Sequence, residues 1–154
     1  KGFAFTENKP CVAVSGLEAM AYNHLYTDYI ICPLMDARAG QVYNALFLAE
    51  GGRLKQIRED RAISLQELGE ELKNLEKPVF LVGDGSNLCY NTLLREIGLL
   101  ILPKEHQLHQ RAVGVGLAAL RQLQQGDPGN AGLLAPNYLR LSQAERERLA
   151  REQK

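Results

Sequence analysis

The residues of this chain best suited to chemistry lie in the stretch Asp36-Ala37-Arg38-Ala39-Gly40, between the apolar runs Tyr29–Met35 and Val42–Ala49. An acid at the end of one strand, a short glycine-bearing turn and a returning strand predict a β-hairpin. A hairpin of this kind can hold nucleotide phosphates, but it then needs more glycine than Gly40, because backbone amides must approach the anion closely. Two interpretations remain open: a residual polar site for a nucleotide or a partner, and an Asp36–Arg38 pair that stabilises the hairpin. We favour the structural one.

A second candidate is Gly83-Asp84-Gly85, which follows the apolar run Val79–Val82. A glycine-rich segment at the start of a helix could bind an anion such as a nucleotide phosphate, because helix N-termini favour negative charge. Asp84, however, would repel a phosphate. We therefore expect a tight strand-to-helix turn, because an isolated glycine motif is weak support for a binding site.

The histidines and serines predict no catalytic centre. His106 and His109 are spaced as a metal pair could be, but no third ligand has a matching spacing, so we expect a solvated helix start. We expect His24 at the surface. Three serines begin predicted helices with a glutamate three residues later, as in a capping box, and none lies in a Gly-x-Ser-x-Gly turn. These serines are Ser15, Ser64 and Ser142. We predict no catalytic residue and no metal site.

Hydrophobic periodicity predicts the elements that would position these residues. Strands are expected at 11–14, 29–36, 41–49, 54–61, 79–82 and 99–102, and helices at 17–26, 65–75, 87–97, 107–125 and 145–154. Pro33 weakens the strand at 29–36, because proline cannot donate to a ladder. Three antiparallel strands followed by alternating helices and strands indicate an α/β, ribonuclease-H-like lobe, with a mixed sheet and flanking helices.

The composition limits the class of protein. A chain of 154 residues with 45% hydrophobic residues can form one globular domain or one lobe of a larger protein. Lys plus Arg and Asp plus Glu are equal at 18 each, whereas a free-standing nucleic-acid binder usually carries a basic excess. The odd set Cys11, Cys32 and Cys89 suggests reduced thiols in a cytoplasmic protein. No apolar run approaches the roughly 20 residues that span a bilayer, so we expect no membrane contact.

Several segments together resemble the TsaB (YeaZ) family, whose members are bacterial subunits of the machinery that makes threonylcarbamoyladenosine in tRNA. The matching segments follow one another across nearly the whole chain: Lys1–Phe5, Val14–Ala19, Asp36–Arg38 with Val42-Tyr43, Val82–Gly85 and Pro136–Arg140. The resemblance implies an actin-like, glycoprotease-like fold of two ribonuclease-H-like lobes. It also implies N-terminal truncation: residues 1–14 would be a remnant of the first lobe, 15–135 the second lobe, and 136–154 an extended segment with a charged C-terminal helix.

The same resemblance implies a subunit without catalysis. In the catalytic TsaD paralogues, two histidines four residues apart bind a metal on the equivalent helix, and the aligned positions here are Gly16 and Met20. Neither suits a hard metal. The expected role is a non-catalytic scaffold in the complex that modifies the adenosine beside the anticodon.

The partners implied are a TsaD-like catalytic paralogue and a TsaE-like ATPase, with tRNA contacted only through the complex and a homodimer also possible. ATP and metal are expected on the partner subunits and no cofactor on this chain alone. The main dimer surface of such families lies on the first lobe, so Phe3 and Phe5 are expected to be exposed and sticky. The alternatives are an active actin-like kinase or ATPase whose phosphate hairpin lies in the missing lobe, and a homodimeric binding module.

Overall fold

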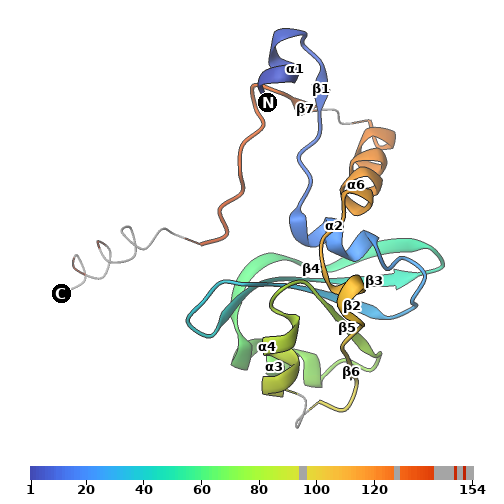
Figure 1. Ribbon diagram of the computed structural model, residues 1–154, viewed down its shortest axis with the longest axis vertical. Coiled ribbons are helices and arrows are strands. Elements are labelled where there is room, and N and C mark those ends of the chain that lie inside the picture. The colour runs from blue at the N-terminus through green and yellow to red at the C-terminus, as the bar shows by residue number, and fades with distance from the viewer. Residues whose placement is uncertain (94–96, 127–128, 141–147, 149–150, 152–154) are drawn as a thin grey trace.

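A five-stranded mixed sheet forms the centre of the molecule (Figure 1). The computed structural model describes residues 1–93, 97–126, 129–140, 148 and 151. In the order β4-β3-β2-β5-β6, the strands are β4 (Arg53–Ser64), β3 (Gln41–Glu50), β2 (Ile30–Asp36), β5 (Val79–Val82) and β6 (Leu100–Ile101). β2, β3 and β4 pair antiparallel, whereas β5 is parallel to both β2 and β6. The predicted mixed sheet with three antiparallel strands is confirmed.

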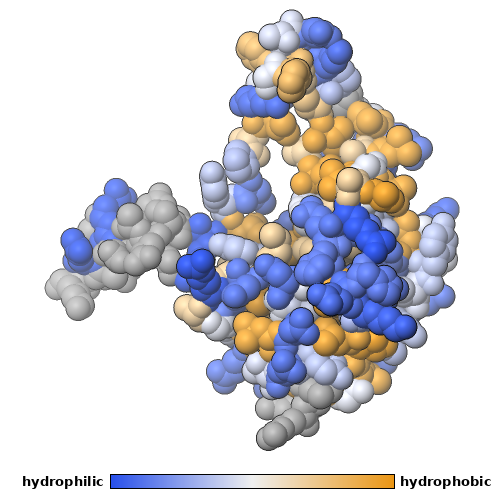
Figure 2. Space-filling view, in the orientation of Figure 1, coloured by the Kyte–Doolittle hydropathy of each residue, from blue (hydrophilic) through white to orange (hydrophobic). Residues whose placement is uncertain are grey.

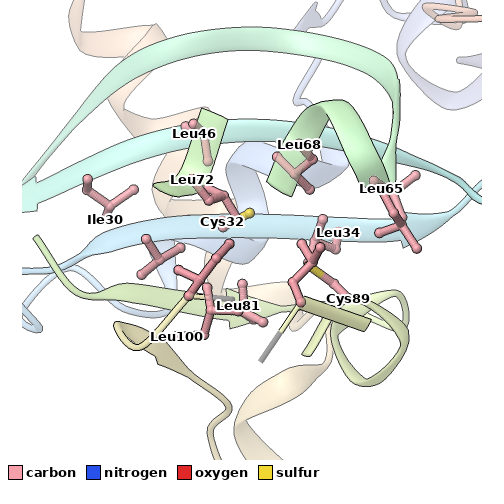
Figure 3. Packing of buried hydrophobic residues seen from close by; sticks show 14 residues of the cluster. Ile30, Cys32, Leu34, Leu46, Leu65, Leu68, Leu72, Leu81, Cys89 and Leu100 are labelled. Carbon is pink, nitrogen blue, oxygen red and sulfur yellow. The ribbon is translucent and has the colours of Figure 1, made fainter. Parts of the chain in front are cut away.

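Side chains that alternate along each strand build one core on each face of the sheet. On β2, Ile30, Cys32 and Leu34 face α3 (Leu65–Lys73) and α4 (Ser86–Leu93), and Figure 3 shows this packing. Ile31 faces the other way, toward α2 (Gly16–Tyr22). α6 (Ala112–Gln124) packs on α2, with Gly114 and Ala118 as its buried residues. Helices therefore cover both faces, as the sequence predicts.

Pro33 lies in the middle of the sheet, contrary to the weakening we expected, and Asn44 explains why. Ala49 N donates to Tyr29 O, and Ala37 N donates to Gln41 O. Because hydrogen-bonding positions alternate in an antiparallel pair, the odd-numbered residues of β2 are the ones that bond to β3. By this alternation Pro33 faces Ala45 at a hydrogen-bonding position, where it has no N–H to donate. The buried Asn44 side chain donates instead, from Nδ2 to the carbonyl oxygen of Ala45 at 2.9 Å and of Pro33 at 3.1 Å.

Asn44 also joins a polar network that ties α3 to the sheet. Its Oδ1 accepts a hydrogen bond from Arg61 Nη2 at 3.2 Å, and Arg61 pairs in turn with Glu71 of α3. Arg58 pairs with the same carboxylate. Every member is therefore bonded, which is the condition for a polar group to be tolerated in a core.

The predicted helix 107–125 is wrong as a single element. The structure has α5 (Glu105–Leu108) and α6, separated by extended backbone at His109 and Arg111. Leu108 accepts a hydrogen bond from Gly83 N, which holds α5 at the sheet, whereas Gly114 must lie against α2. A Cβ on Gly114 would be 2.0 Å from the carbonyl oxygen of Ala19. One straight helix does not satisfy both contacts.

Other boundaries also differ from the prediction. The helix expected at 17–26 ends at Tyr22, the strand expected at 54–61 continues to Ser64, and the helix expected at 87–97 is described only as α4. The strand expected at 11–14 is reduced to β1 (Pro10–Cys11). The C-terminal helix predicted from residue 145, with its Ser142 cap, falls largely outside the described residues.

One end of the molecule stands apart from the sheet. Within the described residues β1 pairs with β7 (Gly129–Asn130) alone, and the short helix α1 (Gly2–Thr6) beside them has no buried residue (Figure 1). We call α1, β1 and β7 the arm. Phe3 is 97% exposed and Phe5 66% exposed, as expected. No helix within the described part of the chain is long and apolar enough to cross a membrane.

Candidate functional site

The β2–β3 turn is held by its own backbone. Ala37 N donates to Gln41 O at 3.0 Å, and Gln41 N donates to Arg38 O at 3.1 Å. The Asp36 carboxylate accepts a hydrogen bond from the backbone N–H of Arg38 at 2.7 Å. The interaction between Asp36 and Arg38 is therefore a side-chain-to-backbone bond, and the ion pair we favoured is wrong in that detail. Asp36 does stabilise the hairpin, as that interpretation required.

The conformation of this turn is strained. Arg38, Ala39 and Gly40 have φ angles of 63°, 53° and 71°, in the left-handed region where only glycine is free of a steric penalty. Such outliers often occur at functional turns. The amides of Ala37 and Arg38 already have partners within the hairpin. They are therefore not available to cradle a phosphate in this conformation.

Gly83, Asp84 and Gly85 form the tight strand-to-helix turn that we expected. Gly83 has a φ of 101°, and a Cβ there would lie 2.1 Å from the carbonyl oxygen of Leu34. Gly85 N donates to that same oxygen at 3.1 Å. The carboxylate of Asp84 accepts a hydrogen bond from Asp36 N at 3.2 Å. The two predicted candidate sites, the β2–β3 turn and the Gly83 turn, therefore meet at the C-terminal ends of β2 and β5. The glycines are explained by the close approach of β2, without a ligand.

A cavity lies beside the β2–β3 turn, between the start of α2 and the extended segment 137–140. Its volume is about 380 Å³, within the range of small-molecule pockets. Arg140 connects it to the hairpin, because Arg140 Nη1 donates to the carbonyl oxygen of Ala37 at 2.7 Å. Asp36 and Arg38 themselves are not among the described residues that line it. The lining is Val14–Leu17, Met35, Tyr43, Asp60 and 137–140.

Asp60 is the acidic group of this cavity, and an irregular strand aims it there. The pairing of β3 with β4 shifts register between Asn44 and Leu46 and again between Leu46 and Phe47, with the additional residues on β4. Bulges of this kind redirect side chains. Asp60 accepts a hydrogen bond from the Ser15 hydroxyl, while Ser15 Oγ also accepts bonds from the first turn of α2. Ser15 is thus a helix cap, although Glu18 does not complete the predicted capping box.

Glu18 lies close to these groups and is perturbed by them. Burial raises the pKa of its carboxyl, Arg121 opposes this effect, and Asp60 adds to it. Asp60 and Glu18 both line an adjoining wider cavity of about 770 Å³. Among the described residues, no group of three or more His, Cys, Asp or Glu side chains is placed so that it could hold a metal ion.

His24 is buried, which corrects the surface position we expected. The His24 side chain is 8% exposed and packs against Phe80, with ring centroids 4.9 Å apart. Its Nε2 lies 3.1 Å from the carbonyl oxygen of Gln107. Burial lowers the pKa of the imidazole, against the raising effect of the hydrogen bond to Gln107. His106 and His109 are exposed, as predicted.

The remaining predicted positions behave as structural residues. Gly16 begins α2, and Met20 is 3% exposed in the core under that helix. Ser64 caps α3 in a complete capping box with Glu67. Ser142 lies outside the described residues. Burial raises the pKa of the Cys32 thiol well above its ordinary value and that of Cys89 to about 12, so these free thiols are unreactive.

Sequence reasoning missed two residues that shape this region, Asn44 and Asp60. An asparagine in the apolar run Val42–Ala49, opposite a strand that contains a proline, is a signal that could have identified Asn44. No such signal identifies Asp60, because the direction of its side chain depends on bulges in β4 that the local sequence does not predict.

Comparisons with known proteins agree on one family. Residues 1–148 match the family model described as "TsaD: tRNA N6-adenosine threonylcarbamoyltransferase". The chain is 31% identical over 149 residues to the tRNA threonylcarbamoyladenosine biosynthesis protein TsaB of Bacillus subtilis (strain 168). That match covers 94% of this chain and 62% of the relative, so the chain spans less than two thirds of the relative's length.

Two solved structures from Pseudomonas aeruginosa share the fold. One is described as YeaZ and the other as an uncharacterized protein with similarity to peptidase YEAZ, with TM-scores of 0.66 and 0.67 and sequence identities of 19% and 18%. Each match covers 90% of this chain and 63% of the other chain. These neighbours agree with the predicted ribonuclease-H-like fold.

Proposed function

The chain belongs to the TsaB (YeaZ) family, and from this we propose that it serves in the biosynthesis of threonylcarbamoyladenosine in tRNA as a non-catalytic scaffold subunit. The proposal that the subunit is non-catalytic rests on the residues found at two positions, Gly16 and Met20. The resemblance aligns these positions with the metal-binding histidines of the catalytic paralogues. Here one has no side chain, and the other is buried in the core.

The β2–β3 hairpin supports the same proposal. Its amides at Ala37 and Arg38 bond to groups within the hairpin, and the carboxylate of Asp36 occupies the turn. A phosphate placed there would meet that negative charge and would find few free N–H donors. An ATPase or kinase that used this hairpin would have to rearrange it.

The partners in this proposal are a TsaD-like catalytic paralogue and a TsaE-like ATPase, which would supply the metal and ATP in the cytoplasm. The tRNA would be bound through the assembled complex, which fits a chain with no net charge. We assign residues 15–135 to the second lobe and residues 1–14 to the first. The separation of α1 and β1 from the five-stranded sheet favours the boundary near residue 14, whereas β7, which lies within 15–135, pairs with β1 and stands apart with it.

Reconstitution tests the proposal. The purified protein, in a form that includes the first lobe expected to carry the dimer surface, is added to TsaD-like and TsaE-like proteins from its own organism with the adenylate donor and tRNA, and modified nucleoside is measured by mass spectrometry. We expect no product from the chain alone, and more product from the mixture with the chain than without it. Calorimetry with ATP, on the protein with its first lobe and without any partner, should show no binding. Tight ATP binding, or product formation without the TsaD-like protein, would refute the scaffold role and favour an active actin-like enzyme.

A further inference from the structure

The extended segment 134–140 runs from the arm to the sheet, and we call it the strap (Figure 1). Its residues 135–138 are exposed, and Figure 2 shows the strap at the surface, apart from the hydrophobic residues that gather over α6. Among the described residues, no backbone N–H of the strap donates a hydrogen bond to another backbone group. Segments with an exposed backbone and few buried contacts open locally at little cost in free energy.

Two contacts of its last residues hold the strap against the sheet. Leu139 is partly buried and packs against the core cluster on the α2 side of the sheet. Arg140 Nη1 donates to the carbonyl oxygen of Ala37 in the β2–β3 turn at 2.7 Å, and we call this bond the clasp. Its donor is charged, so it is stronger than a bond between neutral groups. It also joins two of the segments on which the family resemblance rests, 36–38 and 136–140.

The clasp acts on a turn that is strained. Ala37 immediately precedes Arg38 and Ala39, whose φ angles of 63° and 53° lie in the left-handed region. Backbone strain of this kind persists only where the surrounding contacts hold it. Because the clasp is one of those contacts, its release weakens the support of the turn.

The strap is also one wall of the cavity of about 380 Å³. Residues 137–140 contribute this wall, and α2, β2, β3 and β4 contribute to the remainder of the lining. Met35 of β2 lines the cavity and is 38% exposed. A displacement of the strap therefore opens the cavity and changes the surroundings of Met35.

We propose that the strap is a gate of this cavity, closed by the clasp, and that its opening and the relaxation of the β2–β3 turn occur together. The structure shows the closed form. In the open form Leu139 leaves the core cluster, Arg140 leaves the carbonyl oxygen of Ala37, and small molecules in solution reach the cavity lining. The gate lies within the chain itself and does not rest on the proposed role in tRNA modification.

Methyl NMR on the full chain tests the gate, because its two methionines lie in contrasting places. Met35 lines the cavity, whereas Met20 is 3% exposed beneath α2. Relaxation dispersion of labelled methionine methyl groups detects exchange on the microsecond-to-millisecond timescale, and we expect it at Met35 and not at Met20. Arg140→Leu removes a bond with a charged donor and should raise the open population about tenfold. Arg140→Lys, which keeps a charged donor, should raise it less.

Hydrogen exchange tests the coupling of the strap to the turn. The amides of Ala37 and Gln41 are hydrogen-bonded within the turn, and both should exchange about tenfold faster in Arg140→Leu, while the amides of β5 keep their rates. The matched control is Arg111→Leu, which removes an arginine–carbonyl bond to His106 away from the cavity. This control should leave Met35 and the turn unchanged.

Three results would overturn the proposal. A Met35 signal without exchange in both the wild type and Arg140→Leu would exclude the gate. More exchange at Met35 without faster exchange of the turn amides would exclude the coupling. Equal changes at Met20 and in β5 would show that Arg140→Leu lowers the stability of the whole chain, and the clasp would then have no separate role.

Discussion

Replacement of Asn44 by alanine should be among the most damaging single changes in this protein. The side chain is fully buried and has three roles: it donates to Ala45 O and to Pro33 O, and it accepts from Arg61. Two neutral hydrogen bonds contribute about 1 kcal/mol each, and the bond from the charged guanidinium about 1.5 kcal/mol. The expected loss in unfolding free energy is therefore about 3.5 kcal/mol, against a total of about 5–15 kcal/mol for a typical domain.

Urea denaturation followed by circular dichroism measures this loss. With a slope of about 2 kcal/mol per molar urea, the midpoint should fall by about 1.8 M. Asn91→Ala on the exposed side of α4 is the matched control and should change the unfolding free energy by less than about 0.5 kcal/mol. Asn44→Asp preserves the size of the side chain but replaces its donor by a carboxylate oxygen. At pH 7 it should therefore be at least as destabilising as alanine.

The result that would refute the reasoning is a loss below about 1 kcal/mol for Asn44→Ala together with a neutral effect of Asn44→Asp. The side chain would then be filling space, and it would not be replacing the N–H that Pro33 lacks. A double-mutant cycle with Arg61→Met separates the two contributions, since only the guanidinium bond should show coupling.

Four further outcomes are expected. Gly83→Ala should lower the melting temperature by roughly 6–12 °C, because its Cβ would lie 2.1 Å from Leu34 O at a φ of 101°. Ala39→Gly should raise the unfolding free energy by about 0.5 kcal/mol in urea titrations, because relief of a φ of 53° exceeds the entropic cost of glycine; a loss of stability would argue against strain in the turn. Burial lowers the pKa of His24, so just below pH 6.5 the unfolded chain binds a proton that the folded chain does not. The unfolding free energy should therefore fall as pH falls below 6.5. The variant His24→Gln should show a weaker dependence of the unfolding free energy on pH. Burial raises the pKa of Glu18, so the charged carboxylate destabilises the folded chain at pH 7. Glu18→Gln should therefore have a higher unfolding free energy than the wild type at pH 7, and this difference should shrink as pH falls toward 4.5. An equal difference at both pH values would exclude ionisation of Glu18 as its cause.

The sheet and its helices could be predicted because alternation is a local property of the sequence. In β2 the odd and even positions separate cleanly into Ile31 on one face and Ile30, Cys32 and Leu34 on the other. The capping box at Ser64 was equally readable, because both of its partners lie within four residues. Patterns of this kind need no knowledge of distant parts of the chain.

The larger errors depend on contacts between distant segments. The break between α5 and α6 follows from the attachment of Leu108 to Gly83, and the burial of His24 from its packing against Phe80. In the candidate site, Asp36 and the Gly83 turn were found, but their connection through Asp84 was not. Asp60 enters the cavity because β4 bulges against β3, a consequence of pairing geometry and not of residue type.

The pairing of β1 with β7 has a consequence for how the chain folds. Its register joins Pro10 to Asn130 and Cys11 to Gly129, so it closes a loop that contains the entire five-stranded sheet. Closing a long loop costs conformational entropy, and the short β1–β7 ladder offsets little of that cost. The arm should therefore form last during folding and open first under native conditions, and its amides should exchange with solvent far sooner than those of β2 and β5. The segments that precede and follow the sheet are thus joined by a unit that should open more easily than the sheet itself.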